Sequence, residues 1–266
     1  MNENETVLKG GNLNEVIRIG ETVRRPLKKW SPTIHRLLKH LEENSFNWAP
    51  NFHGIDENNR EILSYIPGET AVDFPRLRPY MMTDEVLCDI ANTLKRFHDV
   101  STSFKTDIND EWMLSYPGSL PVEVICHNDF APYNVVFSNG TVKGIIDFDT
   151  ACPGPRIWDI AYTLYTFVPL GRYVYDQFCD ELTDYDTKKH ACNRKERIEI
   201  FFNTYGLNKP DDLIDQVVFR LKALCNTIDT KAKGGDKSFE KMICEGHLLH
   251  YQKEIEFIKT HGCEWI

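Results

Sequence analysis

The sequence lacks the features of exported, membrane-bound and nucleic-acid-binding proteins. Charged residues interrupt the first twenty positions, so no apolar stretch there is long enough for a signal peptide or a membrane span. Basic residues are in the minority, 31 against 40 acidic ones, and the net charge of −9 has the wrong sign for binding phosphate backbones or anionic lipid. We therefore expect a cytoplasmic protein with no nucleic-acid partner and no membrane partner.

Disulfides and internal repeats are not expected either. Eight cysteines occur in 266 residues without an export signal, which favours reduced thiols over disulfide bonds. The 41% share of hydrophobic residues argues against disorder along the chain. At this length, one large domain or two coupled lobes are the organisations to expect.

The beginning of the chain has the pattern of a small antiparallel sheet with one helix. Residues 6–8, 15–19 and 22–27 are short strand-like runs separated by glycine-containing turns. Ser31-Pro32 begins a helix with apolar residues at 34, 37, 38 and 41. A second hairpin covers residues 52–55 and 61–66, and Pro67-Gly68 ends it. We predict an N-terminal lobe over 1–66 and a C-terminal lobe over 67–266.

The remainder of the chain has mainly helical patterning. Apolar spacing predicts a helix over 83–98, residues 122–125 a strand, and residues 135–137 with 142–148 a hairpin. Beyond Trp158 we expect helices to the end of the chain.

A dense group of polar residues surrounds this hairpin. His127, Asp129 and Asn134 precede it, and Asp147 and Asp149 follow it. Pairing Phe137 with Val142 would place Asn134 opposite Ile145, with Asp147 about 7 Å further along the ladder. Amide and carboxylate oxygens are ligands that Mg²⁺ prefers while it bridges nucleotide phosphates. We therefore predict Asn134 and Asp147 as metal ligands, with Asp129 beside them to accept a hydroxyl proton.

The pattern H-x-D-x-x-x-x-N followed by D-x-D resembles the aminoglycoside phosphotransferase and choline kinase-like family, distant relatives of protein kinases. The similarity extends to Pro153-Gly154-Pro155 and Trp158-Asp159-Ile160-Ala161, and upstream to Arg24-Arg25-Pro26 and the hinge at 63–68. It covers most of residues 5–170. The resemblance implies an α+β, two-lobed protein kinase-like fold that binds nucleotide between its lobes.

Individual roles follow from the resemblance. Asp129 would be the catalytic base, Asn134 and Asp147 would hold Mg²⁺, and His127 and Asp159 would support the loop. In the N-terminal lobe, Gly11 would lie in the loop that covers the phosphates, although no complete glycine-rich motif is present. Tyr65 and Ile66 at the hinge would line an adenine slot, for which a core role is an alternative.

The third strand and the following helix depart from the family pattern. The family places a Lys or Arg of this strand against the nucleotide phosphates, and the Arg-x-Pro spacing favours Arg24, with Arg25 facing the other side. The helix Glu that partners this cation is missing, because His35 stands in its place. Arg24 and Arg25 both remain candidates for the phosphate contact.

The preferred function is transfer of a phosphate from ATP or GTP to a hydroxyl of a small molecule. The alternative is a nucleotide-binding pseudokinase or immunity-type protein with weak or no transfer. His35 and the sparse glycine loop motivate it, and some proteins with a similar Arg-Arg-Pro strand are described as immunity proteins against a peptide toxin. A metal-dependent phosphoesterase is disfavoured, because one histidine near the aspartates is too few for a two-metal cage.

Two acidic runs bear on the acceptor. Residues 180–184 and 211–215 have the composition of solvated helix faces. If they lined the cleft, they would favour a cationic acceptor such as an aminoglycoside or an amino alcohol. The sequence leaves open the acceptor, the choice between ATP and GTP, and the oligomeric state.

Overall fold

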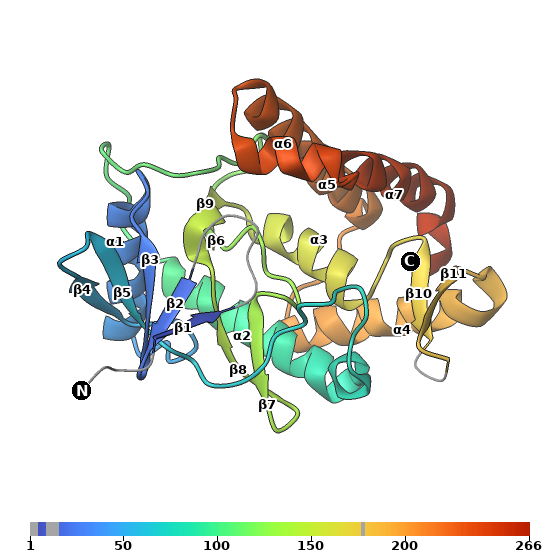
Figure 1. Ribbon diagram of the computed structural model, residues 1–266. Helices are drawn as coiled ribbons and strands as arrows, with labels where there is room; N and C mark the ends of the chain where they lie inside the picture. Colours follow the sequence, from blue (N-terminus) through green and yellow to red (C-terminus); the bar gives the residue numbers. More distant parts are fainter. Residues whose placement is uncertain (1–4, 9–15, 177–178) are drawn as a thin grey trace. The chain divides into compact units, whose positions relative to one another are not determined.

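The computed structural model describes residues 5–8, 16–176 and 179–266 (Figure 1). Contacts along the chain divide it into two compact units. The first unit comprises residues 1–72 and 93–156, and the second comprises 73–92 and 157–266. The lobe boundary after residue 66 stays a prediction.

The first unit begins with an antiparallel sheet of five strands in the order β1-β2-β3-β5-β4. Their bounds are Glu5–Leu8 (β1), Val16–Ile19 (β2), Thr22–Pro26 (β3), Phe52–Ile55 (β4) and Arg60–Ser64 (β5). Helix α1 (Ser31–Glu43) begins at the predicted Ser-Pro and buries Ile34, Leu37, Leu38 and Leu41. The predicted small antiparallel sheet with one helix is confirmed.

The pairing of β3 with β5 decides which side chains share a face. Arg25 lies opposite Glu61, and Val23 lies opposite Leu63. Because side chains alternate along a strand, these four residues share one face of the sheet. Arg24 and its partner Ile62 are on the other face.

The rest of the first unit consists of two short ladders and their loops. β6 (Val124–Cys126) pairs with β9 (Cys152–Gly154), and β7 (Val135–Ser138) pairs with β8 (Thr141–Ile145). A short 3-10 helix, η2 (Phe148–Thr150), follows β8. Buried Phe97, Phe130, Phe137 and Phe148 contribute to the core. Helix α2 (Asp84–Ser101) has residues in both units.

The β7–β8 hairpin differs from the predicted register by one residue at its open end. Phe137 lies opposite Val142 as predicted, but a bulge follows Val136 and places Val135 opposite Ile145. The amide of Ile146 instead donates to the carbonyl oxygen of Asn134 at 2.9 Å. A bulge adds one residue to one strand and bends it. The extra residue moves Asn134 one step closer to Asp147 than regular pairing would.

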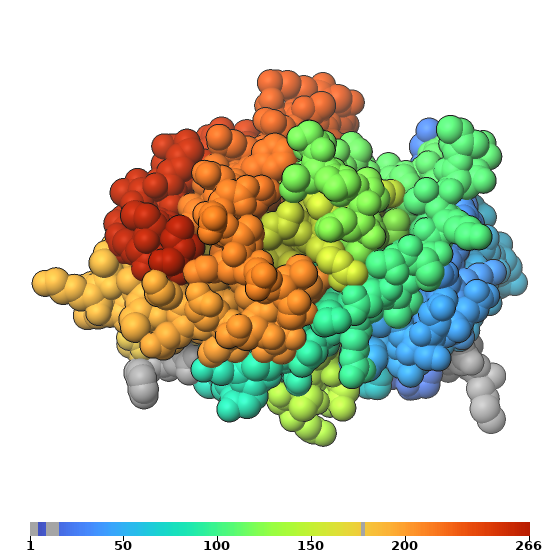
Figure 2. Space-filling model, turned by 180° about the vertical axis from the view of Figure 1, so that it is seen from behind, coloured from blue at the N-terminus to red at the C-terminus, as the bar shows by residue number. Residues whose placement is uncertain are grey.

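The second unit is mainly helical. It contains η1 (Pro79–Met82), α3 (Arg156–Phe167), α4 (Thr187–Tyr205), α5 (Leu213–Lys233), α6 (Lys237–Cys244), α7 (His247–His261) and η3 (Gly262–Trp265). Helix α5 packs against α6 and α7, and Figure 2 shows this group in orange to red.

One hairpin interrupts these helices and corrects the prediction of helices to the end of the chain. β10 (Tyr173–Asp176) pairs with β11 (Glu181–Asp184). The aromatic and β-branched run Tyr173-Val174-Tyr175 explains the strand, because such side chains favour a pleated surface. The acidic run at 180–184 therefore belongs largely to an exposed strand, not to a helix face.

In the described residues, no helix combines the length and apolarity that a membrane crossing requires. All eight cysteines belong to these residues, and each is a free thiol.

Candidate active site

The loop from His127 to Asn134 is tied to the turn that follows β8. Asn128 adopts a left-handed backbone with φ of 65°, which asparagine tolerates better than most residues. Its amide nitrogen donates to the carbonyl oxygen of Thr150 at 2.8 Å, and the Thr150 hydroxyl donates to the carbonyl oxygen of His127 at 2.9 Å. These reciprocal bonds fix the loop against η2.

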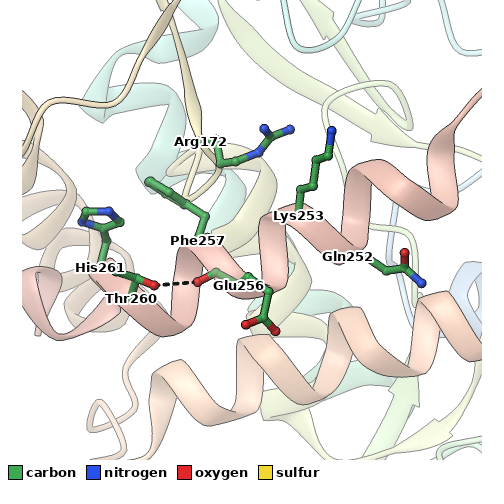
Figure 3. Close-up of a pocket in the computed structure, with 7 residues that line it drawn as sticks. All are labelled: Arg172, Gln252, Lys253, Glu256, Phe257, Thr260 and His261. Atoms are coloured by element: carbon green, nitrogen blue, oxygen red, sulfur yellow. Dashed lines mark hydrogen bonds between the residues drawn. The ribbon is translucent and has the colours of Figure 1, made fainter.

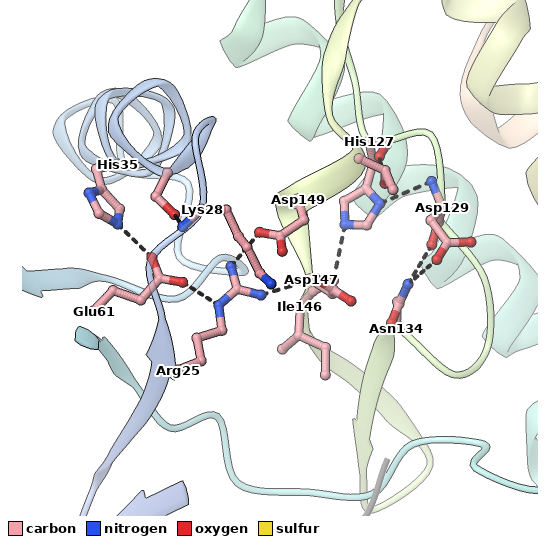
Figure 4. A network of polar contacts seen from close by, with 12 residues as sticks. Arg25, Lys28, His35, Glu61, His127, Asp129, Asn134, Ile146, Asp147 and Asp149 are labelled. Carbon is pink, nitrogen blue, oxygen red and sulfur yellow. Dashed lines mark hydrogen bonds and ion pairs between the residues drawn. The ribbon is translucent and has the colours of Figure 1, made fainter. Parts of the chain in front are cut away.

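Asp129 accepts a hydrogen bond at each carboxylate oxygen. The Asn134 amide nitrogen donates to Oδ2 at 2.8 Å and also to the Asp129 carbonyl oxygen at 3.0 Å. The Tyr133 hydroxyl donates to Oδ1 at 2.6 Å. The predicted base and the predicted metal ligand Asn134 are therefore joined directly, as Figure 4 shows.

His127 is fully buried between this loop and the end of the hairpin. Its Nδ1 accepts from the Asp129 amide at 3.3 Å, so Nε2 carries the proton that is donated to the Ile146 carbonyl oxygen at 3.1 Å. The ring also meets Phe148 edge to face, with centroids 4.7 Å apart. These contacts orient the backbone on both sides of the site and place His127 in a bracing position.

Asp147 also has a left-handed backbone, with φ and ψ both 64°. Such a conformation costs of order 1–3 kcal/mol in a residue other than glycine and is often found at functional sites. It leaves the Asp147 side chain 48% exposed, whereas that of Asp149 is 14% exposed. One cation binds both carboxylates: Arg25 Nη1 lies 3.1 Å from Asp147, and Nη2 lies 2.7 Å from Asp149.

This arrangement corrects the predicted direction of the β3 arginines. Arg24 points to the other face of the sheet, where its guanidinium donates to Thr22 and lies 3.8 Å from Asp56. The two arginines lie on opposite faces, as alternation predicts, and Arg25 is the one that contacts Asp147. Which of them meets the nucleotide phosphates stays a prediction. The apolar neighbour Val23 marks the inner face, and Arg25 shares it.

The carboxylate partner that is missing from helix α1 is supplied by a strand. Glu61 of β5 accepts from Arg25 Nε through one oxygen and from His35 Nε2 of α1 through the other, the latter at 2.5 Å (Figure 4). The His35 ring stacks on Phe52 with centroids 3.7 Å apart. His35, the residue predicted to stand at the position of the family's helix Glu, thus contacts a carboxylate instead of providing one.

The electrostatics of this group are dominated by negative charge. Burial alone would lower the pKa of Arg25, but Asp149, Asp147 and Glu61 outweigh burial and raise it. Burial raises the pKa of Asp149, the charges of Asp147 and Glu61 add to this effect, and Arg25 opposes it. Three carboxylates around one guanidinium leave an excess of negative charge that suits a further cation.

Comparison with known proteins shows which family the chain belongs to. A sequence model described as "Phosphotransferase enzyme family" matches residues 105–189, which include the loop and Asp147. The trifolitoxin immunity protein of Rhizobium leguminosarum bv. trifolii is 31% identical over 209 residues, 77% of this chain and 75% of that protein. The chain belongs to this phosphotransferase family. A homoserine kinase of Zymomonas mobilis subsp. mobilis is 26% identical over 72% of this chain, which spans 46% of the kinase.

Solved structures of phosphotransferases share the fold. The gentamicin complex of APH(2")-IIa has a TM-score of 0.58 at 18% identity, covering 95% of this chain and 93% of that chain. Its streptomycin–ATP ternary complex has a TM-score of 0.52 at 16% identity, covering 96% and 93%. Choline kinase from Cryptosporidium parvum Iowa II has a TM-score of 0.59 at 13% identity, covering 97% and 90%. The predicted α+β, protein kinase-like fold is confirmed.

The family implies a divalent metal, and the donor set present is suited to Mg²⁺. Asn134 directs its amide nitrogen to Asp129, so its carbonyl oxygen would be the atom that holds a metal ion. Asp147 offers a half-exposed carboxylate. Two hard oxygen donors are enough for Mg²⁺, which usually keeps several waters and takes its other ligands from phosphates.

The remaining predicted site residues are Gly11, Tyr65, Ile66 and Asp159. Gly11 lies outside the described residues. The Tyr65 ring lies under the Arg18 guanidinium at 3.7 Å, and Ile66 packs against Gly144 of β8, where a Cβ would come within 2.6 Å of its Cδ1. Asp159 is fully buried in the first turn of α3, in the second unit.

Two contacts of the candidate site were not anticipated from the sequence. Glu61 could have been found, because it alternates with the buried Leu63 and an inward-facing charge needs a partner. Tyr133 gave no such signal, since a tyrosine between two motif residues is compatible with any orientation.

A hollow of about 570 Å³ on the second unit contains none of the predicted site residues (Figure 3). One helix, α7, provides six of its seven lining residues, and Arg172 provides the seventh.

Proposed function

We propose that this protein transfers the γ-phosphate of ATP or GTP to a hydroxyl group of a small molecule. Membership of the phosphotransferase family supports phosphoryl transfer as the reaction class. The observation that carries the proposal is the hydrogen bond from Asn134 to the carboxylate of Asp129. It joins the proposed proton acceptor to a proposed metal ligand within one short loop.

Asp129 is the proposed proton acceptor. An acceptor hydroxyl that donates to its carboxylate gives up its proton as the hydroxyl oxygen forms a bond to the γ-phosphorus. The bond from that phosphorus to the bridging oxygen breaks, and the nucleoside diphosphate leaves. Because the protein contributes mainly positioning and charge neutralisation, a few well-held polar groups suffice.

The phosphates of the donor would meet Arg25, Asn134 and Asp147. Mg²⁺ held by Asn134 and Asp147 would supply charge neutralisation on the phosphate oxygens. Arg25 would bind phosphate oxygens from the side of β3, while Glu61 holds its Nε. The ATP-bound structure of APH(2")-IIa supports ATP as the donor, and GTP is the alternative.

The acceptor is proposed as a class only. Aminoglycosides and amino alcohols are cationic and hydroxylated, and the relatives by fold include proteins named for such substrates. The chain is acidic overall, with a net charge of −9, which favours a cationic acceptor.

A nucleotide-binding protein with little or no transfer is the second candidate. The relative with 31% identity is named an immunity protein, which motivates this alternative directly. Such a protein would act by sequestration or interaction and would have no need of Asp129 as a base.

Binding and turnover together test the proposal. Thermal shift with Mg-ATP and Mg-GTP measures donor binding, and nucleotide consumption is measured against a panel of hydroxylated small molecules. We expect one nucleotide to raise the melting temperature and at least one cationic alcohol to accelerate release of the diphosphate. If neither nucleotide binds, both candidate functions are wrong.

A further inference from the structure

We propose that Glu61 and His35 act as positioning residues that hold Arg25 toward the nucleotide phosphates, in place of the carboxylate that the family's helix supplies. The inference rests on the proposed function, since it assigns Arg25 to the phosphates. It concerns a chain of three side chains from three elements, β3, β5 and α1.

All three side chains are largely buried, so Glu61 needs hydrogen-bond donors from the protein. The Glu61 side chain is 2% exposed, that of His35 is 10% exposed and that of Arg25 is 12% exposed. A carboxylate removed from water is stable only when charged or polar donors replace its hydration. Glu61 has such a donor on each oxygen, Arg25 Nε on one and His35 Nε2 on the other.

The two ends of the Arg25 guanidinium have different partners. Nε is committed to Glu61, whereas Nη1 and Nη2 extend to Asp147 and Asp149. Glu61 lies on β5 directly opposite Arg25, so this carboxylate belongs to the same sheet as the cation. We refer to Glu61 and His35 together as the anchor of Arg25. The two Nη groups are the ends available to phosphate oxygens once a nucleotide and its metal compete for the aspartates.

His35 completes the anchor from the helix. Its ring is held flat against Phe52 of β4, so that Nε2 is directed at Glu61. A carboxylate at this helix position would face Glu61 across a hydrogen-bond distance, and two like charges in a buried site repel. A side chain with an N–H donor, such as histidine, therefore suits this helix position when the carboxylate is on the strand.

A double-mutant cycle on nucleotide affinity tests the positioning role in the full-length chain. We expect Glu61→Gln and Arg25→Gln each to weaken binding of the Mg-nucleotide about tenfold, and the double variant to be no weaker than Arg25→Gln alone. The matched control is Glu57→Gln, at an exposed glutamate in the turn before β5, which should bind within twofold of wild type. Melting temperatures without nucleotide are recorded for every variant, so that loss of fold is distinguished from loss of affinity.

Substitutions at His35 test the same anchor from the helix side. His35→Gln keeps an N–H donor for Glu61, and we expect affinity within about threefold of wild type. His35→Glu places a second carboxylate against Glu61, and we expect a loss of affinity of about tenfold or more.

Three results would overturn the proposal. One is a Glu61→Gln variant that binds nucleotide as wild type does, another is fully additive losses in the cycle, and the third is tighter binding by His35→Glu. If wild type binds neither Mg-ATP nor Mg-GTP, the proposed function fails instead. In that case the contact between Glu61 and His35 is tested by the unfolding free energies of Glu61→Gln, His35→Ala and the double variant. If the losses of the two single variants add up to the loss of the double variant, the two residues are not coupled and the anchor is refuted.

Discussion

Asp129 and Tyr133 make the most informative single contact of the proposed site. The Tyr133 hydroxyl donates to Oδ1 at 2.6 Å, the geometry that an acceptor hydroxyl must reach before it can lose its proton. Tyr133 therefore occupies, within the protein itself, the kind of position that an acceptor hydroxyl would take.

Removal of this hydroxyl should favour the acceptor. We predict that Tyr133→Phe lowers the KM of an active acceptor by about threefold to tenfold, while kcat stays within about twofold. Steady-state kinetics with varied acceptor measure both parameters, and Tyr173→Phe, which removes a hydroxyl from β10, is the control. A fall in kcat with KM unchanged would show that the hydroxyl assists the transition state and does not compete with the acceptor.

Asn134 and Asp147 should set the metal requirement. We predict that Asn134→Ala and Asp147→Ala each raise the Mg²⁺ concentration for half-maximal nucleotide binding by at least about tenfold, with the larger effect at Asp147, whose charge is lost. Titration of Mg²⁺ at fixed nucleotide concentration checks this, with Lys143→Ala on the exposed side of β8 as control. An unchanged requirement in both variants would remove them from the site.

At the scale of elements, local sequence signals predicted most of the site's framework. Ser31-Pro32 identified the start of α1, strand-like runs between turns predicted β3 to β5, and the Phe137–Val142 pair gave the hairpin register at its closed end. The bulge after Val136 could not be anticipated, because no local pattern in the sequence marks it. The backbone beside it also bonds to a segment far away in the sequence. The β10–β11 hairpin was missed because helical patterning on both sides hid a short strand signal.

One such long-range contact joins the segment that follows β5 to β7. Glu69 and Phe137 exchange backbone hydrogen bonds of 2.9 and 2.8 Å. Gly68 precedes this bridge with φ of 151°, and a Cβ at its position would overlap the Phe137 carbonyl oxygen and the Val136 side chain. The close approach therefore depends on glycine.

We predict that Gly68→Ala lowers the free energy of unfolding by about 2–4 kcal/mol. Gly140 in the β7–β8 turn is the matched control, because its φ of 73° is also positive but a Cβ there would meet nothing within 4 Å. Gly140→Ala should cost only about 1 kcal/mol. Denaturant unfolding monitored by tryptophan fluorescence measures both, and equal losses would mean that backbone strain alone, without the steric clash, explains the effect.

At the scale of the whole molecule, the sequence specified the reaction class better than the substrate. Asp129, Asn134 and Asp147 lie within 19 residues of one another, so their spacing alone indicated a shared site. The contact of Arg25 with Glu61 depends on the pairing of strands whose residues are 36 positions apart. No local sequence pattern reveals such a pairing. The acceptor depends on surfaces formed by distant segments, and a fold shared by several kinases does not specify it.

The most direct test compares wild type with Asp129→Asn in acceptor-stimulated nucleotide consumption. The substitution removes the proton acceptor but keeps a side chain of the same shape, so Mg-nucleotide affinity should stay within about twofold while transfer falls by at least about a hundredfold. We predict an acceptor-dependent release of ADP or GDP by wild type that Asp129→Asn abolishes. Equal rates for the two proteins with every acceptor, at equal nucleotide affinity, would contradict it and leave a nucleotide-binding protein without transfer.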